Sequence, residues 1–201
     1  MATLSERIAT MCRAAVVTEK ATGCPAELLV AQCAVESGWL QHAPGNNALG
    51  YKHYPGAFGK QLLATTEWFT DEQAVEFADG NTSILEIPSD QTIELPDDRT
   101  IRPMNTRIND KRMYAVRDWF AVFPSLEACF ARRAERWKAG QSLPWVKAFH
   151  KTGDLTAMLR AMAAGYATAP DYADSLLAVL DKPEVQVGLA QARADLDMLT
   201  A

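Results

Sequence analysis

The sequence predicts an α+β fold that is mainly helical, with a small lobe of β-hairpins inserted between two helical regions. Two observations predict this class. Apolar residues recur at helical spacing in the first and last thirds of the 201-residue chain, whereas the middle third contains short β-prone runs separated by turn-forming residues. We therefore expect one domain over residues 1–201, with an α lobe at about residues 1–58 and 124–201 and a β lobe at about residues 59–123.

Two helices are expected in the first third. Thr3, with Glu6 three positions later, forms a capping-box pattern, and the helix that begins there should end at Gly23. Pro25 suits the first position of a helix and Gly38 suits a C-terminal stop. A second, mostly apolar helix is therefore expected between these two residues.

The middle third is expected to form hairpins. Its β-prone runs occupy residues 61–69, 74–77, 82–87, 92–95 and 114–123. An enlarged insertion covers about residues 79–113 and ends in a locally basic stretch, which consists of Arg99, Arg102, Arg107, Lys111 and Arg112. We interpret this stretch as a solvated face.

Helical patterns return in the last third. Four helices are expected there, at about residues 126–137, 155–164, 170–180 and from Pro183 to the C-terminus. Asp154 is placed to cap the second of them.

Charge and hydropathy exclude several classes of partner. The chain contains 20 Lys and Arg residues against 25 Asp and Glu residues, so its formal net charge is -5. This acidic balance argues against nucleic acid as a partner, because neutralising phosphates requires a basic face. No apolar run approaches the roughly 20 residues that a membrane span requires. No signal peptide is visible after Met1.

The cysteines and histidines do not form a metal-binding pattern. The four cysteines include no C-x-x-C pair, and the three histidines form no H-E-x-x-H motif, so we expect neither a metal nor a cofactor. A disulfide between Cys12 and Cys33 is one alternative for the thiols. We favour four reduced thiols in the core: Cys12, Cys24, Cys33 and Cys129.

Glu36 stands out by its position at the C-terminal end of the second expected helix. It follows Cys33 by three residues and Leu29 by seven, which places it beside apolar neighbours. Partial burial and the negative end of the helix dipole would both disfavour its charged form, as a carboxylic general acid requires. The alternative is a helix-end Glu that reaches into water or pairs with a lysine.

Three segments carry a resemblance to a known family. Residues 31–39 read A-Q-C-A-V-E-S-G-W, residues 46–52 read N-N-A-L-G-Y-K, and residues 165–173 read G-Y-A-T-A-P-D-Y-A. In this order they resemble the signature of the bacterial β-N-acetylglucosaminidases of glycoside hydrolase family seventy-three, the flagellar-type and autolysin-type peptidoglycan hydrolases. The resemblance covers roughly residues 27–180.

The resemblance implies a lysozyme-like fold in which the helical lobe and the β lobe flank a substrate groove. It also implies that Glu36 is the general acid and that a second carboxylate lies on the β lobe, where the family shows T-x-E before an aromatic residue. Glu67, which precedes Trp68, matches that pattern. Glycosidase chemistry commonly uses such a pair. Catalysis assisted by the substrate's N-acetyl group stays open, and the alternative second carboxylates are Glu72, Glu76 and Glu86.

Five further residues are candidates for binding the substrate. Tyr166 matches a functional tyrosine of the family that holds the acetamido group or orients the acid; the alternative is an aromatic packed at a helix junction. Trp68 and Trp119 can stack on sugar rings, or they can belong to the hairpin core. Asn47 can hydrogen-bond the catalytic region or fix a turn, and Gln32 can support Glu36.

The function that the resemblance implies is hydrolysis of the β-1,4 bond after N-acetylglucosamine in peptidoglycan. The alternatives are a muramidase acting on the same polymer and a non-catalytic wall-binding or assembly protein with this fold. The expected partner is the glycan strand, and the basic stretch is a candidate contact for its peptide stems. The site of action is then the cell wall, in the periplasm or outside the cell. Because no signal peptide is visible, we expect delivery by phage or secretion machinery, or an incomplete start.

Overall fold

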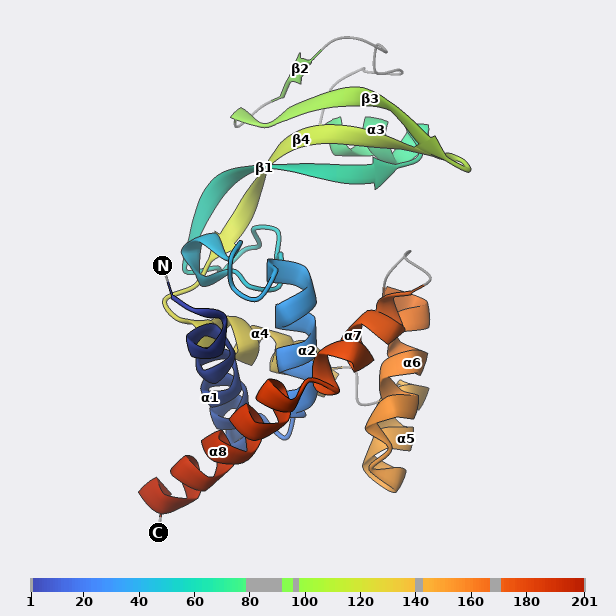
Figure 1. Ribbon diagram of the computed structural model, residues 1–201. Coiled ribbons are helices and arrows are strands. Elements are labelled where there is room, and N and C mark those ends of the chain that lie inside the picture. The colour runs from blue at the N-terminus through green and yellow to red at the C-terminus, as the bar shows by residue number, and fades with distance from the viewer. Residues whose placement is uncertain (1, 79–91, 96–97, 140–142, 167–170, 201) are drawn as a thin grey trace. The chain divides into compact units, whose positions relative to one another are not determined.

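The computed structural model of the chain describes residues 2–78, 92–95, 98–139, 143–166 and 171–200. The chain divides into two compact units (Figure 1). The helical unit contains residues 1–50 and 123–201, and the strand unit contains residues 51–122. The order is therefore helical, strand, helical, as the sequence predicts.

The helical unit begins with α1 and α2, and both follow their end signals. In α1 (Leu4–Thr22) the Thr3 side chain accepts a hydrogen bond from the Glu6 N–H and the Glu6 carboxylate accepts one from the Thr3 N–H, so the capping box is confirmed. Gly23 ends α1 with a φ of 74°. α2 (Ala26–Ser37) ends at Gly38 with a φ of 55°, which residues with a Cβ rarely adopt.

The remaining helices of this unit lie later in the chain. After a short 3₁₀ turn at Pro44–Asn46, they are α4 (Leu126–Ala139), α5 (Pro144–Thr152), α6 (Leu155–Tyr166), α7 (Tyr172–Leu180) and α8 (Pro183–Thr200). α1 packs against α2, α4 and α8, and α2 also packs against α7. Asp154 caps α6 through the N–H of Ala157, as expected. α5, which begins at a proline, was not predicted.

The α1–α8 contact depends on a glycine within α8. A Cβ added to Gly188 would lie 3.0 Å from Cys12 Sγ and 3.4 Å from Ile8 Cγ2, both on α1. Because most Cβ contacts are wider than this, a larger residue at position 188 would force the Cys12 side chain to move by a few tenths of an ångström. A glycine inside a helix costs roughly 1 kcal/mol relative to alanine, and close packing offsets that loss.

The strand unit is a four-stranded antiparallel sheet in the order β1-β4-β3-β2. Its strands are β1 (Gly59–Phe69), β2 (Ile93–Glu94), β3 (Thr100–Ile108) and β4 (Lys111–Val122). β1 and β4 pair without interruption, from Gly59 opposite Val122 to Phe69 opposite Arg112. The basic stretch turns out to be largely the β3–β4 hairpin, and β3 was not predicted.

One β-prone run was wrong. The run at residues 74–77 lies within a helix, α3 (Asp71–Ala78). Thr70 and Gln73 form a reciprocal cap at its start, since each backbone N–H donates to the other's side chain. Buried Ala74 and Ala78 then lie on one face, four residues apart, against a cluster that includes Tyr114, Val116 and Ile101. The run at residues 82–87 lies outside the described residues.

The boundary between the units lies at residues 50 and 51 rather than near residue 58. The N–H of His53 donates to the carbonyl of Trp119, and the N–H of Ala121 donates to the carbonyl of Tyr51. Lys52 is bridged to Phe120. Residues 51–53 therefore extend the sheet along β4, and they belong to the strand unit.

Candidate active site

The turn after α2 explains the E-S-G-W segment in physical terms. Buried Ser37 donates to the Cys33 carbonyl and accepts the N–H of Leu40 at 2.9 Å, so its hydroxyl closes the end of the helix. Gly38, Trp39 and Leu40 have φ values of 55°, 61° and 62°. Left-handed backbone at two residues that carry a Cβ costs of order 1 kcal/mol each, and such strain is concentrated at functional sites.

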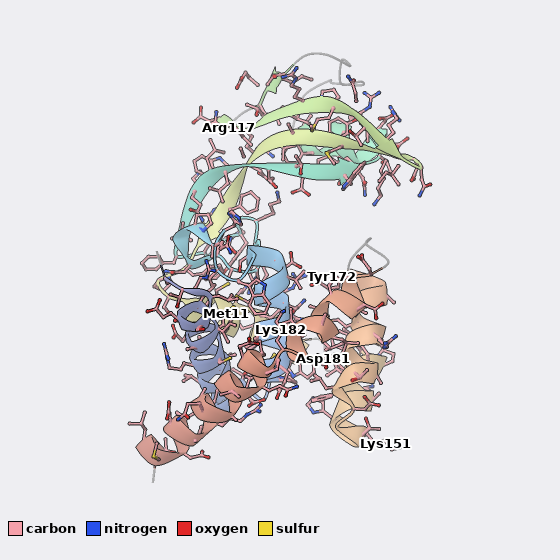
Figure 2. All side chains as sticks on the ribbon, in the orientation of Figure 1. Met11, Arg117, Lys151, Tyr172, Asp181 and Lys182 are labelled. Atoms are coloured by element: carbon pink, nitrogen blue, oxygen red, sulfur yellow. The ribbon has the colours of Figure 1, made fainter. Side chains whose placement is uncertain are left out.

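Glu36 lies immediately before this turn, at the end of α2. It is exposed, so the expected partial burial is wrong. The carboxylate instead contacts the protein through one oxygen: the Tyr172 hydroxyl donates to Oε1 at 2.8 Å. No other hydrogen bond to Glu36 occurs among the described residues. Tyr172 is the first residue of α7 (Figure 2), and it is buried.

A buried polar chain lies behind this contact. Gln32, one turn before Glu36 on α2, has no exposed surface. Its Nε2 lies 3.4 Å from the Tyr172 hydroxyl oxygen, and its Oε1 accepts a hydrogen bond from Arg133 Nε at 2.7 Å. A fully buried amide does not touch a substrate in this conformation. The geometry therefore favours the supporting role that was expected for Gln32.

The asparagine loop is fixed to the backbone around Phe123. Asn46 donates through Nδ2 to the Phe123 carbonyl at 3.0 Å, while the Phe123 N–H donates to the Gly45 carbonyl at 2.8 Å. Asn47 is only 5% exposed. Its contact with a substrate stays a prediction.

The tyrosine that contacts Glu36 is Tyr172, which was not among the residues predicted from the sequence. The side chain of Tyr166 and residues 167–170 lie outside the described part of the structure, so the role of Tyr166 stays a prediction. Both tyrosines belong to the segment G-Y-A-T-A-P-D-Y-A. The second tyrosine of that segment, Tyr172, was therefore visible in the sequence as a candidate partner of Glu36.

Glu67 lies on β1 and shares a lysine with a second carboxylate. Lys52 Nζ lies 2.8 Å from Glu67 Oε1 and 3.0 Å from Asp118 Oδ2. Glu67 is opposite Tyr114 and Asp118 is opposite Leu63, so the uninterrupted register places both carboxylates on one face of the sheet. Lys52 is the last residue of the N-N-A-L-G-Y-K segment. Neither it nor Asp118 was selected from the sequence.

The two candidate tryptophans lie on the other face of this sheet. Trp68 follows Glu67 directly, and Trp119 is opposite Leu62 and follows Asp118 directly. Successive side chains of a strand point to opposite faces. Both rings are half-buried, and Lys60 Nζ lies 4.0 Å from the centre of the Trp119 ring. A single sugar bound beside Glu67 would therefore not stack on these rings in this register.

The alternative second carboxylates are placed less favourably. Glu72 and Glu76 lie on exposed positions of α3, and Glu86 lies outside the described residues. Neither Glu72 nor Glu76 takes part in an ion pair within the described part of the chain. Glu67 and Asp118 therefore remain the stronger candidates.

All four cysteines are free and buried in the helical unit. Burial raises the pKa of the Cys24 and Cys33 thiols to about 12 and that of Cys12 and Cys129 to about 11. Within the described ranges, no three His, Cys, Asp or Glu side chains gather as metal ligands would. None of the helices described has the length and hydropathy needed to cross a bilayer.

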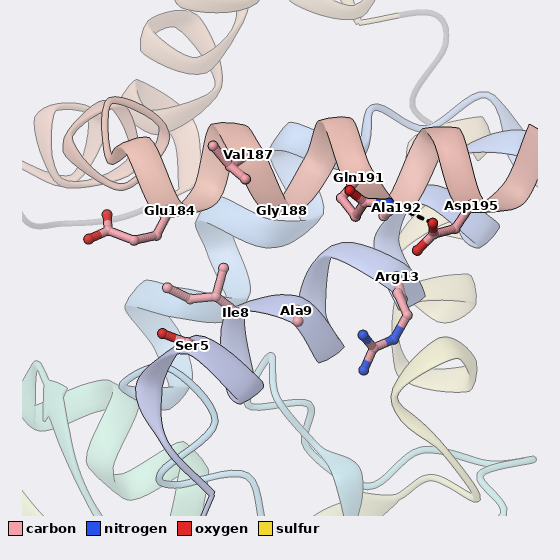
Figure 3. Close-up of a pocket in the computed structure, with 10 residues that line it drawn as sticks. All are labelled: Ser5, Ile8, Ala9, Arg13, Glu184, Val187, Gly188, Gln191, Ala192 and Asp195. Carbon is pink, nitrogen blue, oxygen red and sulfur yellow. Dashed lines mark hydrogen bonds between the residues drawn. The ribbon is translucent and has the colours of Figure 1, made fainter.

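A cavity of about 350 Å³ lies elsewhere, between α1 and α8 (Figure 3). Ile8 and Ala9 line it from α1, and Val187 and Gly188 line it from α8. Neither Glu36 nor any of its hydrogen-bond partners lines it. It is therefore separate from the candidate active site.

Comparisons with known proteins agree with the fold. A family model described as mannosyl-glycoprotein endo-β-N-acetylglucosaminidase matches residues 12–184. No curated protein sequence matches the chain. Among solved structures, a peptidoglycan hydrolase mutant from Sphingomonas sp. A1 is 24% identical with a TM-score of 0.56, and the match covers 93% of this chain and 99% of that one.

Two further structures are similar. The truncated glycoside hydrolase domain of FlgJ from Salmonella typhimurium is 21% identical, with a TM-score of 0.54 and coverage of 88% of this chain and 95% of that one. The catalytic domain of the autolysin Auto from Listeria monocytogenes is 18% identical, with a TM-score of 0.56 and coverage of 96% and 89%. These likenesses confirm the expected lysozyme-like α+β fold class.

Proposed function

We propose that this chain, which belongs to the endo-β-N-acetylglucosaminidase family, hydrolyses the β-1,4 bond after N-acetylglucosamine in the glycan strands of bacterial peptidoglycan. Membership of the family makes the chain a glycoside hydrolase. The choice of polymer is supported by the solved structures it resembles, which include peptidoglycan hydrolases and an autolysin.

One observation supports Glu36 as the general acid. Its carboxyl group is open to solvent, and a buried tyrosine holds one of its oxygens at 2.8 Å. The other oxygen, Oε2, can then carry the proton that passes to the glycosidic oxygen as the C–O bond breaks and its electron pair moves to the leaving sugar. The Tyr172 hydroxyl would stabilise the carboxylate that this transfer leaves behind.

Glu67 is our candidate for the second carboxylate. As an anion it could activate water or stabilise the positive charge that develops on the cleaved sugar. Lys52, 2.8 Å away, would hold its side chain in one orientation. Asp118 is paired to the same lysine and is the direct competitor for this role.

The remaining candidates concern substrate binding. Tyr166 and Asn47 stay proposals for contacts with the acetamido group and the catalytic loop. Trp68 and Trp119 would bind sugar units, or another part of the polymer, on the sheet face opposite Glu67.

The decisive variant is Glu36→Gln, which keeps the shape of the side chain and removes the transferable proton. Release of soluble fragments from purified sacculi should fall by roughly a thousandfold or more, because the acid step would be lost. Glu127→Gln, an exposed replacement of the same kind on α4, is the matched control and should retain activity. Unchanged hydrolysis by the Glu36→Gln enzyme, with the wild-type melting temperature, would overturn the assignment.

Product analysis tests the bond and the polymer. After borohydride reduction, mass spectrometry should find reduced N-acetylglucosamine at the fragment ends; reduced muramic acid would identify a muramidase. If the enzyme releases glycans from a glycoprotein but no fragments from sacculi, its substrate is a glycoprotein and not peptidoglycan. Binding to sacculi without release of fragments by the wild-type chain would indicate a non-catalytic wall protein.

The proposed substrate lies outside the cytoplasmic membrane. We therefore place the activity at the cell wall, in the periplasm or at the outer surface. Delivery by phage or secretion machinery stays a prediction. Expression in the cytoplasm with and without a fused export signal tests where the chain acts: lysis should require export.

A further inference from the structure

Arg133 of α4 is buried beside the candidate site. It is 6% exposed, and no ion pair to it occurs among the described residues. Its Nε donates to Gln32 Oε1 at 2.7 Å, and its Nη2 lies 3.5 Å from Met162 Sδ. A buried cation is costly unless it is paired or hydrogen-bonded. In the described part of the chain, the oxygen that accepts from it belongs to a neutral amide.

The guanidinium determines which way that amide faces. Because an arginine can only donate, the Gln32 oxygen must face Arg133, and the Gln32 NH₂ group must then face Tyr172. The Tyr172 hydroxyl accepts from that NH₂ group at 3.4 Å. Its single proton is then directed to Glu36 Oε1, 2.8 Å away. The chain therefore has one direction, from the cation to the carboxyl group.

We propose that Arg133 is a positioning residue for Glu36, acting through Gln32 and Tyr172. It fixes the Tyr172 hydroxyl as a donor to Oε1, which keeps the acidic proton on Oε2 and stabilises the carboxylate that forms when this proton leaves. This inference rests on the proposed role of Glu36 as the general acid. The cation strengthens each hydrogen bond in the chain, because aligned donors polarise one another in a medium of low dielectric.

Burial protects the hydrogen bonds between Arg133, Gln32 and Tyr172 from water. Gln32 is fully buried and Tyr172 is 7% exposed, so water does not compete for the contacts between them. The participants come from three helices, α4, α2 and α7, which lie far apart in sequence. The direction of one tyrosine proton thus depends on how all three helices pack.

Gln32→Glu separates positioning from packing. A glutamate has the same shape and would form an ion pair with Arg133, which is stronger than the present hydrogen bond to a neutral amide. The fold should therefore be kept or stabilised. It offers only acceptors to Tyr172, whose proton would turn toward residue 32 and away from Glu36. We expect kcat on sacculi fragments to fall roughly tenfold to a hundredfold, with KM little changed and no loss of melting temperature. A purely structural role for Gln32 predicts unchanged kcat.

A double-mutant cycle with Tyr172→Phe tests the route. Tyr172→Phe removes only the hydroxyl, and it should lower kcat by a similar factor. If the effect passes through this hydroxyl, the double variant should be no slower than Tyr172→Phe alone. Multiplied effects in the double variant would overturn the proposal, as would wild-type kcat in Gln32→Glu. If Gln32→Glu does not fold, Arg133→Met takes its place in the same cycle with the same expectations, because it removes the donor that orients the Gln32 amide.

Gln186→Glu on the exposed side of α8 is the matched control, since it adds the same charge to the same unit. It should leave kcat unchanged. An active Glu36→Gln enzyme overturns the proposed function. An inactive Glu36→Gln enzyme together with a fully active Gln32→Glu enzyme overturns only the positioning chain.

Discussion

Each unit of the molecule contains one cation between two carboxylates, and the two clusters differ in what they connect. In the helical unit, Arg193 of α8 lies 3.0 Å from Glu19 of α1 and 2.8 Å from Glu27 of α2. In the strand unit, Lys52 pairs with Glu67 and Asp118. The cations have nearly the same exposure, 41% and 43% of the side chain.

Exposure therefore does not distinguish the clusters, but their other contacts do. Glu19 also accepts the N–H of Ala26 at 2.9 Å, so the arginine cluster ties together the start of α2 and two helices from opposite ends of the sequence. The partners of Lys52 lie on β1 and β4, which a continuous ladder already joins. We infer that the first cluster serves stability and that the second serves function.

The largest expected effect lies in the lysine cluster. Glu67→Gln should lower kcat on sacculi by roughly a hundredfold, because the proposed second carboxylate would be lost, whereas Asp118→Asn should cost less than about tenfold. Both replacements keep the side-chain shape and remove one partner of Lys52. If Asp118→Asn has the larger effect, Asp118 is the second carboxylate. If both effects are small and equal, the Lys52 cluster does not take part in catalysis.

The next largest effect is expected at Gly38, beside Glu36, where backbone conformation and not charge determines stability. Gly38→Ala should lower the free energy of unfolding by about 2 kcal/mol, since its φ is 55° and a Cβ would lie 3.3 Å from His42 Cδ2. Gly153→Ala is the control: its φ is 69°, but nothing lies within 4 Å, so about 1 kcal/mol is expected. Urea unfolding measures both. Equal losses would show that His42 moves aside without cost.

The two cations should show opposite effects on stability and activity. Arg193→Gln should lower the free energy of unfolding by about 1–2 kcal/mol and leave kcat unchanged. Lys52→Gln should cost less than about 1 kcal/mol in stability but lower kcat several-fold. The stability loss of Arg193→Gln should be smaller in about 1 M salt, because salt at that concentration screens ion pairs that are exposed to solvent. If Lys52→Gln proves the less stable variant, the comparison is wrong.

The smallest effect uses the thiols, all of which lie in the helical unit. At pH 8 a thiol-reactive dye should not label the native enzyme, because burial raises the pKa of these thiols to about 11 or 12. Stability should be independent of the thiols below pH 9. It should fall as pH rises from about 9 to 11, since only the unfolded chain ionises there. Rapid labelling at pH 8 would show that this unit opens readily.

The sequence predicted those helices whose ends carry clear signals. The capping box of Thr3 and Glu6 identified α1, but the similar box of Thr70 and Gln73 was missed, because a helix of eight residues shows too little periodicity to be told from a strand. β3 was hidden by its charges and by Pro103, where the pairing register shifts. Strand rules that expect apolar alternation do not find such a segment.

The candidate site residues come from local motifs. Glu36 and Glu67 were selected from short segments that contain them. Tyr172 meets Glu36 across 136 residues, and Arg133 meets Gln32 across 101, so only the packing of α4 and α7 against α2 reveals them. The expected partial burial of Glu36 was wrong for a related reason. The position of a residue on a helix indicates which residues lie beside it on that helix, but not whether other segments cover it.

Gly188 limits which substitutions α8 accepts without a shift of α1. Every single-step replacement at this position introduces a Cβ 3.0 Å from Cys12 Sγ, whereas the adjacent Val187 is 68% exposed and has room for nearly any side chain. Within α8, two neighbouring positions thus differ in how freely they accept a larger side chain. We expect a replacement at position 188 to cost least where Cys12 or Ile8 has first been made smaller, so the order of substitutions in this helix matters.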